Sequence, residues 1–379
     1  MNEFAIDFYQ NMLTIVIVII SCMSLFIFAL RKEKDFKILL ILFLWHTFFS
    51  LVYYTYTLNN TADARDYYRV SLTDNLVLSP GTKFVYYITS FPSKILDASY
   101  LNVTLFYNLI GSLGLVLLYL SLRNLFKYLS WHWLFILFIP SMSFWSSGLG
   151  KDSISFFATC LFLYAITVSK KAILLIPISF FAMFMVRPHI AAAMGASYVI
   201  YFIIQSKVHL VFKILTLPII FFGIFLSISF VQQYIGLDEA SLSSVTGYID
   251  DRQGSNLEGG SSLDIASMSY PMQIFTYVFR PLPFEAHNVV SLISSLENII
   301  LLFLFLYILF KSKFNLRPFI QGKNLWLFTY VFLTCSVLAM TTANLGIASR
   351  QKWMFMPVLL YLLIYSFHNY KLHKSRIYQ

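Results

Sequence analysis

Residues 11–58 read NMLTIVIVIISCMSLFIFALRKEKDFKILLILFLWHTFFSLVYYTYTL, and this stretch decides the fold. It holds two apolar runs, 11–30 and 37–58, separated by the charged turn RKEKDF. Each run has the roughly 20 apolar residues that an α-helix needs to cross the hydrocarbon core of a bilayer. The stretch therefore predicts two membrane-spanning helices joined by a short basic turn.

The rest of the chain repeats this pattern. Of its 379 residues, 59% are hydrophobic and only 12% are charged, whereas soluble domains carry about 25% charged residues. We expect an all-α polytopic membrane protein with a single integral membrane domain over residues 1–379. About eleven spans are predicted, at approximately 11–30, 37–58, 102–122, 130–148, 153–169, 171–187, 190–206, 210–235, 289–310, 325–342 and 353–369.

Basic residues predict the orientation of these spans. Loops after the odd-numbered spans, together with the C-terminus, hold 17 of the 27 Lys and Arg residues, while acidic residues gather on the other face. Because cytoplasmic loops are rich in Lys and Arg, the N-terminus is predicted outside and the C-terminus in the cytoplasm. The three cysteines lie inside apolar runs and predict neither a disulfide nor a metal site.

Two long segments are predicted on the outer face. Residues 59–101 contain an amphipathic stretch, 83–96, interrupted by Pro92, which is typical of an interfacial helix. Residues 236–288 contain the Gly- and Ser-rich stretch QGSNLEGGSSLD before aromatic character returns. Because loops of this length are usually functional or disordered, we interpret 236–288 as a lid over an external cavity.

The outer face also carries cations at predicted helix ends, where topology alone would make them scarce. Arginine binds phosphate through a planar, bidentate fork, so this pattern predicts an anionic ligand such as a pyrophosphate. Nucleic acid is not expected, because these cations do not form an exposed basic stripe. The residues predicted to bind the pyrophosphate or the glycan are Arg187, His189, Arg280, Arg350, Lys151 and Lys352, together with Tyr67 and Arg69.

Structural roles that need no ligand stay open for the same residues. Arg187 can extend towards lipid headgroups. Asp152, beside Lys151, suits a helix start because of the helix dipole. An ion pair between Arg280 and Glu285 would fold their proline-rich loop without any ligand.

A carboxylate-rich segment, TADARDYYRVS at 61–71, follows the second span. If it is helical, Asp63 and Tyr67 lie one turn apart, as do Asp66 and Arg69. A carboxylate here is a candidate general base for a sugar hydroxyl, and the alternative is a solvated loop with local ion pairs. Glu285 with His287, in YVFRPLPFEAHN at 277–288, is a second candidate for the base.

In these features the chain resembles the Wzy-type polysaccharide polymerases and shares traits with the lipid-linked-sugar glycosyltransferases of the GT-C superfamily. The resemblance rests on the N-terminus predicted outside the membrane, on the Asp63–Tyr67 segment, and on the stretches FWSSGLGKDS, FRPLPFEA and LGIASRQKW. It implies a polymerase on the periplasmic face of the bacterial inner membrane, which joins repeat units carried on undecaprenyl pyrophosphate. It also implies no nucleotide and no cofactor, and a chain-length regulator as a possible partner.

Under this resemblance Arg187, Arg280 and Arg350 hold the pyrophosphate, and a carboxylate accepts the proton of the acceptor hydroxyl. Three alternatives remain open: a GT-C-like transferase that uses a polyprenyl-phosphate sugar, an O-antigen ligase, and a non-enzymatic flippase of lipid-linked sugar. A flippase is expected to carry cations deep within its helices and short loops on both faces. This chain instead has its outer cations at helix ends, beside a long outer loop.

Overall fold

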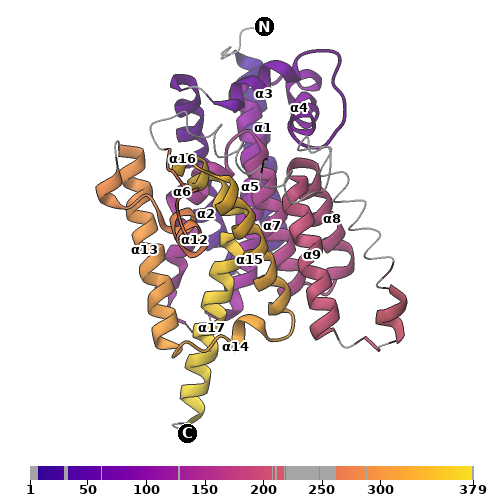
Figure 1. Cartoon of the computed structure of the whole chain (residues 1–379). Helices are drawn as coiled ribbons and strands as arrows, with labels where there is room; N and C mark the ends of the chain where they lie inside the picture. Colours follow the sequence, from indigo (N-terminus) through magenta and orange to yellow (C-terminus); the bar gives the residue numbers. More distant parts are fainter. Residues whose placement is uncertain are drawn as a thin grey trace. The chain divides into compact units, whose positions relative to one another are not determined.

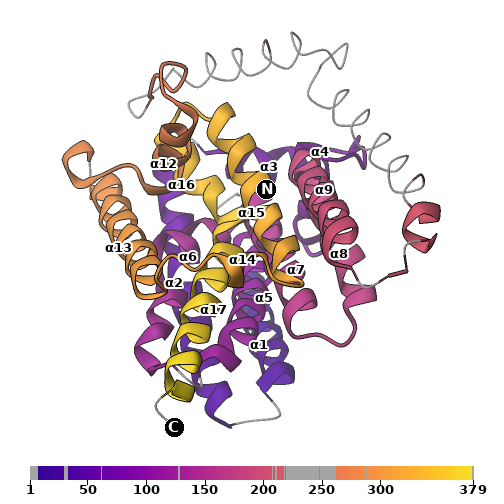
Figure 2. The same ribbon diagram turned by 60° about the horizontal axis from the view of Figure 1, so that its bottom comes forward.

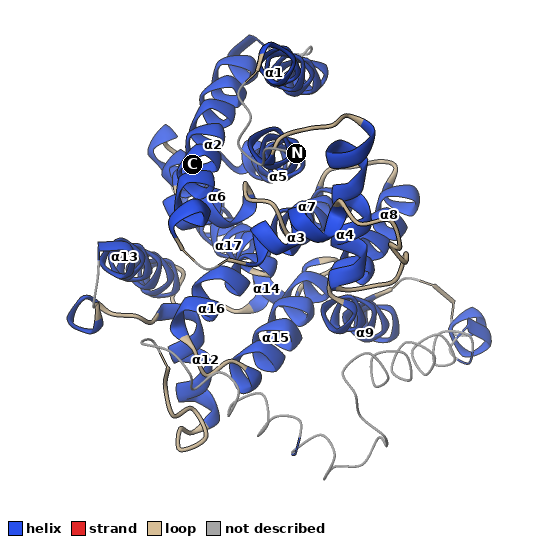
Figure 3. Cartoon of the chain, turned by 90° about the horizontal axis from the view of Figure 1, so that it is seen from above, coloured by secondary structure: helices blue, strands red, loops and turns tan. Residues whose placement is uncertain are grey.

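The computed structural model describes residues 7–29, 33–60, 62–126, 129–206, 208–209, 211–216, 218, 247, 262–286 and 289–377. Within these ranges helix is the only extended regular structure (Figure 3). Most of the predicted span 210–235 and of the predicted lid 236–288 lies outside the described residues. The chain divides into two compact units, Met1–Pro188 and His189–Gln379.

The described elements of the first unit are drawn from indigo to magenta in Figure 1. They are α1 (Phe8–Ala29), α2 (Glu33–Asn59), α3 (Asp63–Ser71), α4 (Thr82–Ser90), the π-helical turn η1 (Phe91–Ile95), α5 (Tyr100–Phe126), the 3-10 helix η2 (Trp131–Phe138), α6 (Pro140–Ser146), α7 (Lys151–Thr167) and α8 (Ala172–Val186).

Helix α5 is the centre of the first unit, because it packs against α1, α2 and α7 and is buried along most of its length. Two glycines make this packing possible. A Cβ added at Gly111 would lie 1.9 Å from the carbonyl oxygen of Ser146, and one at Gly114 would lie 2.9 Å from the Phe156 ring. Small residues at helix interfaces let backbones approach closely in membrane proteins. The sequence Gly111–Gly114 therefore seats α6 and α7 on α5.

The predicted span 130–148 is interrupted at Pro140. The structure has the 3-10 helix η2 there, followed at Pro140 by the short α6. Proline lacks an N–H and disfavours α conformation in the residue before it, and Ile139 is accordingly extended. The chain therefore changes direction at Pro140, and α6 packs against α2 and α5.

The second unit continues from α9 (Pro188–Gln205). Its other described elements are α12 (Tyr270–Phe279), the 3-10 turn η3 (Pro283–Glu285), α13 (Val289–Lys311), α14 (Arg317–Ile320), α15 (Asn324–Thr341), α16 (Leu345–Gln351), the 3-10 turn η4 (Lys352–Met354) and α17 (Met356–Ile377). Helix α15 packs against α12 and α17, and α13 packs against α17 as well.

Six of the described helices are long and apolar enough to cross a bilayer: α1, α2, α5, α9, α13 and α15. Helix α8 is apolar but shorter, and the number eleven stays a prediction. In Figure 3 α1 and α5 are both seen nearly end on. Large apolar side chains such as Ile19, Phe48 and Phe303 are exposed on these helices, which is typical of surfaces that face lipid. The chain is thus an all-α protein of membrane type.

Candidate functional site

The carboxylate segment forms a helix, which is one of the two possibilities that its sequence leaves open. Helix α3 begins at Asp63 and carries Asp66 in its first turn and Arg69 in its last. These three charged side chains are exposed, whereas Tyr67 is buried at 5% exposure. The charges also suit the dipole of α3, with acids near its N-terminus and a base near its C-terminus. Helix α3 therefore exposes two carboxylates next to a buried tyrosine.

Tyr67 connects α3 to the beginning of α7. Its ring lies against Gly150, where an added Cβ would be 3.3 Å from the ring. Gly150 has a φ of +154°, which suits glycine. The next residue, Lys151, is the first of α7. The Tyr67 ring of α3 thus supports the loop before Lys151, which is one of the cations predicted to bind substrate.

Arg187 reaches the same end of α7 from a different helix. It follows the last residue of α8 and forms an ion pair with Asp152, with Nη2 3.0 Å from Oδ1. Both side chains are nearly buried, at 12% and 11% exposure. Arg187 also directly precedes Pro188, the first residue of α9, so it lies between the end of one helix and the start of the next. Its Nε has no hydrogen-bond partner among the described residues.

Helix α4 packs against α3 in the first unit (Figure 1). The Tyr86 ring packs against the Tyr67 ring at a centroid distance of 5.8 Å. Partial burial raises the pKa of the Tyr86 phenol, and the nearby carboxylates of Asp66 and Asp63 raise it further. Both carboxylates therefore lie close enough to the Tyr86 phenol to raise its pKa. The sequence analysis did not select Tyr86.

We use the name α3–α7 site for Asp63, Asp66, Tyr67, Lys151, Asp152 and Arg187. These residues come from α3, the start of α7 and the end of α8. Helices α7 and α8 pack against each other (Figure 2). The site combines exposed carboxylates with two cations at helix ends. Chemically, it can accept a proton on one side and hold an anion on the other.

The second unit holds the remaining predicted cations, and Arg280 is paired there. Its Nε donates to both carboxylate oxygens of Glu285, at 2.9 and 3.1 Å, and its Nη2 also bonds Glu285. Glu285 Oε2 also accepts a hydrogen bond from the backbone N–H of Leu282 at 2.8 Å. The loop is thus folded by the Arg280–Glu285 pair, as the structural role without a ligand predicts.

A chain of hydrogen bonds continues from this loop. The Pro281 carbonyl accepts from Asn298 Nδ2 at 3.2 Å, and Asn298 Oδ1 accepts from Lys352 Nζ at 2.5 Å. Lys352 is 1% exposed. Burial lowers its pKa to about 8, and the nearby Glu297 carboxylate acts in the opposite direction. Lys352 therefore lies in the interior of the second unit rather than on an open surface.

The other predicted residues are placed as follows. Arg350 is half-buried in the last turn of α16, and His189 is half-buried in the first turn of α9. His287 lies outside the described residues. Asn344 begins α16 by accepting hydrogen bonds from the N–H groups of Gly346 and Ile347. Convergence of Arg187, Arg280 and Arg350 on one ligand stays a prediction.

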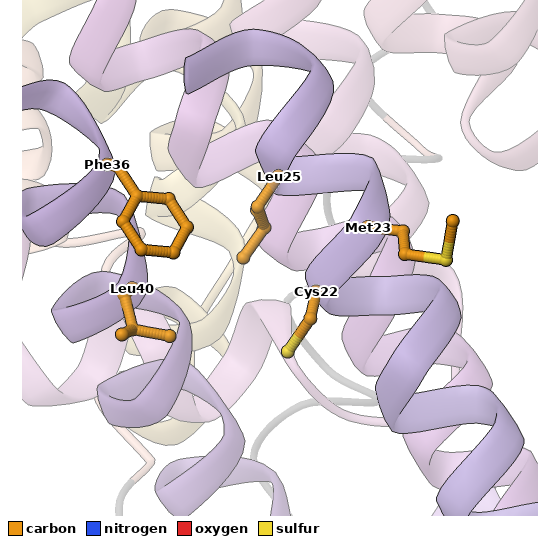
Figure 4. A pocket seen from close by; sticks show the side chains of 5 residues that line it. All are labelled: Cys22, Met23, Leu25, Phe36 and Leu40. Carbon is orange, nitrogen blue, oxygen red and sulfur yellow. The ribbon is translucent and has the colours of Figure 1, made fainter. Parts of the chain in front are cut away.

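A hollow in the first unit lies away from these groups. It is lined by Cys22, Met23 and Leu25 of α1 and by Phe36 and Leu40 of α2 (Figure 4). All five side chains are apolar, so nothing in this lining would bind an anion or a sugar. Elsewhere in the described part of the chain, no three His, Cys, Asp or Glu side chains gather in a group that would hold a metal ion.

Comparison of the chain with protein-family models, with curated proteins and with solved structures finds no match. The functional interpretation therefore rests on the residues themselves. Two residues that sequence reasoning missed are Tyr86 and Asn298. Each is polar and makes its contacts with elements distant in sequence, and only the amphipathic pattern of 83–96 pointed to the neighbourhood of Tyr86.

Proposed function

We propose that this chain is a glycosyltransferase that polymerises lipid-linked oligosaccharide units on the outer face of the bacterial inner membrane. The observation that supports this most is the α3–α7 site, where exposed carboxylates and helix-end cations occur together in the first unit. The proposal includes eleven spans, an outer N-terminus and a cytoplasmic C-terminus. Undecaprenyl pyrophosphate is the carrier that the sequence resemblance implies.

The reaction has one bond formed and one broken. A hydroxyl oxygen of the acceptor sugar attacks the anomeric carbon of the donor glycan, and its proton passes to a carboxylate of α3. The bond between that carbon and the pyrophosphate oxygen breaks, and undecaprenyl pyrophosphate leaves with the electron pair. Positioned cations stabilise such developing negative charge.

Asp66 is the base that we favour. It is exposed, and no ion pair or hydrogen bond joins its carboxylate to another described residue. Glu285, by contrast, is already bonded to Arg280 and to the Leu282 N–H. A general base must have an accessible lone pair in hydrogen-bond reach of the hydroxyl, which favours Asp66 over Glu285.

Lys151 and Arg187 are the cations that we assign to the pyrophosphate. Lys151 stands at the N-terminus of α7, where backbone N–H groups and the helix dipole also favour an anion. Arg187 holds Asp152 through Nη2, while its Nε bonds no described residue. Arg280, Arg350 and His189, in the second unit, stay predicted contacts to the lipid-linked glycan, whereas Lys352 is buried and bonded to Asn298.

Deletion of the gene, followed by sizing of the surface glycan on a gel, tests this function. A polymerase deletion strain is expected to keep single repeat units on their anchor and to lose the long ladder. Loss of every attached unit would instead indicate a ligase or a flippase and would overturn the proposal. Complementation with the wild-type gene, which should restore the ladder, is the control.

A further inference from the structure

Tyr86 occupies a position that the proposed reaction has not used. It is half-buried on α4, with its ring against Tyr67 and its phenol close to the carboxylates of Asp63 and Asp66. No hydrogen bond joins the Tyr86 hydroxyl to another described residue. A partly buried phenol usually finds a polar partner, so this hydroxyl is available to a ligand.

Helix α4 is held firmly at both ends. The backbone N–H of Gly81 donates to the carbonyl of Met185, 2.8 Å away and two residues before Arg187. At the other end, Thr89 Oγ1 and the Tyr107 hydroxyl of α5 are 2.8 Å apart. These contacts position Tyr86 relative to both α8 and α5. A side chain on a rigid element is better suited to orient a ligand than one on a loop.

The chemistry around this hydroxyl fits a sugar. A neutral phenol donates a hydrogen bond, accepts another and offers an apolar ring face. Sugars present hydroxyls on their edges and C–H groups on their faces, which match these features. The adjacent carboxylates accept hydrogen bonds but cannot donate them when ionised, so a donor beside them completes recognition of a hydroxyl pair.

We propose that Tyr86 binds the acceptor sugar of the α3–α7 site, with its hydroxyl on a sugar oxygen next to the hydroxyl that Asp66 deprotonates. This assignment rests on the proposed function and adds to it the residue that orients the acceptor. Tyr86 is thereby a substrate-binding residue, and Tyr67, buried beneath it, supports its ring.

The test compares Tyr86→Phe with Tyr87→Phe in purified protein. Tyr86→Phe keeps the ring that packs on Tyr67 and removes only the hydroxyl. Tyr87 is the next residue, is 44% exposed and lies outside the proposed site, so it is the matched control. The probe is the lipid-linked repeat unit extracted from the deletion strain, presented in liposomes.

Binding of the lipid-linked unit is measured by tryptophan fluorescence. A second assay measures the KM and kcat of chain extension. Because one neutral hydrogen bond contributes about 1 kcal/mol, Tyr86→Phe is expected to weaken binding and raise KM about fivefold, with kcat nearly unchanged. Tyr87→Phe is expected to match the wild type. Unchanged binding and KM in Tyr86→Phe would overturn the assignment.

The binding measurement separates this inference from the proposed function. If the wild type binds the unit through Tyr86 but makes no polymer, the polymerase proposal fails and the sugar site stands. If the wild type polymerises normally and Tyr86→Phe behaves identically, the sugar assignment fails and the polymerase proposal stands. Tyr86→Ala, which also removes the ring, is expected to weaken binding more than Tyr86→Phe.

Discussion

Asp66 and Tyr67 are neighbours in one turn of α3, yet they meet different surroundings. Tyr67 is buried against Tyr86 and Gly150, whereas the Asp66 carboxylate is exposed. The Asp66 carboxylate suits the N-terminal turn of α3, and its exposure also leaves it open to a ligand.

Asp66→Asn tests this at the level of one atom. We expect chain extension to fall by about 100-fold or more, because a positioned general base contributes about 10²–10⁴ to rate, while the melting temperature in detergent changes little. Asp74→Asn is the control, since Asp74 is exposed, pairs with Lys94 and lies outside the site. Loss of extension in Asp63→Asn with normal extension in Asp66→Asn would assign the base to Asp63 and contradict this choice.

Lys352 predicts a pH dependence of stability. Its pKa is lowered from 10.5 to about 8 in the fold, while an unfolded lysine keeps its proton to about pH 10.4. Between these values the unfolded chain binds more protons, so stability rises with pH. We expect the melting temperature of the wild type, relative to Lys352→Met, to increase from pH 8 to pH 10. Parallel melting curves for the two proteins across this window would contradict the prediction.

At the scale of elements, the sequence was sufficient for most helices. Apolar runs of about 20 residues locate α1, α2, α5, α9, α13 and α15. The spacing of Asp63 and Tyr67 allowed the Asp63–Ser71 helix but did not require it. The sequence was not sufficient to predict contacts between segments that lie far apart along the chain. The bonds of His46 to Asn108 and Ser146, at 2.6 and 2.9 Å, cross three helices and leave no periodic signal.

The same limit applies to the candidate site. Helix-end cations could be selected from topology, but their partners could not. That Arg187 faces Asp152 while Arg280 faces Glu285 depends on tertiary packing in one case and on a local proline-rich turn in the other. Only the local pair was anticipated. Tyr86 was missed because the amphipathic helix offers two adjacent tyrosines, Tyr86 and Tyr87, of equal merit until their neighbours are known.

Gly111 tests the packing of α6 on α5. An added Cβ would lie 1.9 Å from the Ser146 carbonyl and 2.8 Å from His46, so the backbone of α6 must move. We expect Gly111→Ala to lower the apparent melting temperature in detergent by several degrees, since overpacking costs about 1–3 kcal/mol or more. Gly114→Ala, which meets mainly the Phe156 side chain, is expected to cost less. Equal melting temperatures for Gly111→Ala and the wild type would contradict this packing.

At the scale of the whole molecule, orientation in the membrane follows from the distribution of Lys and Arg. Single cysteines at Asn60 and Lys170, both exposed, report the two faces. Native Cys160 and Cys335 are buried, and Cys22→Ser removes the half-buried one. An impermeant maleimide is expected to label Asn60→Cys in cells with a permeabilised outer membrane, and Lys170→Cys only after the inner membrane is opened. The reverse pattern would place the α3–α7 site in the cytoplasm and overturn the proposed chemistry.

Reconstitution tests the central claim most directly. Purified protein in liposomes is given the lipid-linked repeat unit from the deletion strain, with no nucleotide sugar, and the products are sized. We expect chains of two or more units with release of undecaprenyl pyrophosphate, and about 100-fold less extension or lower with Asp66→Asn. Recovery of single units alone with folded wild-type protein, or equal polymer from Asp66→Asn and Asp63→Asn, would contradict it.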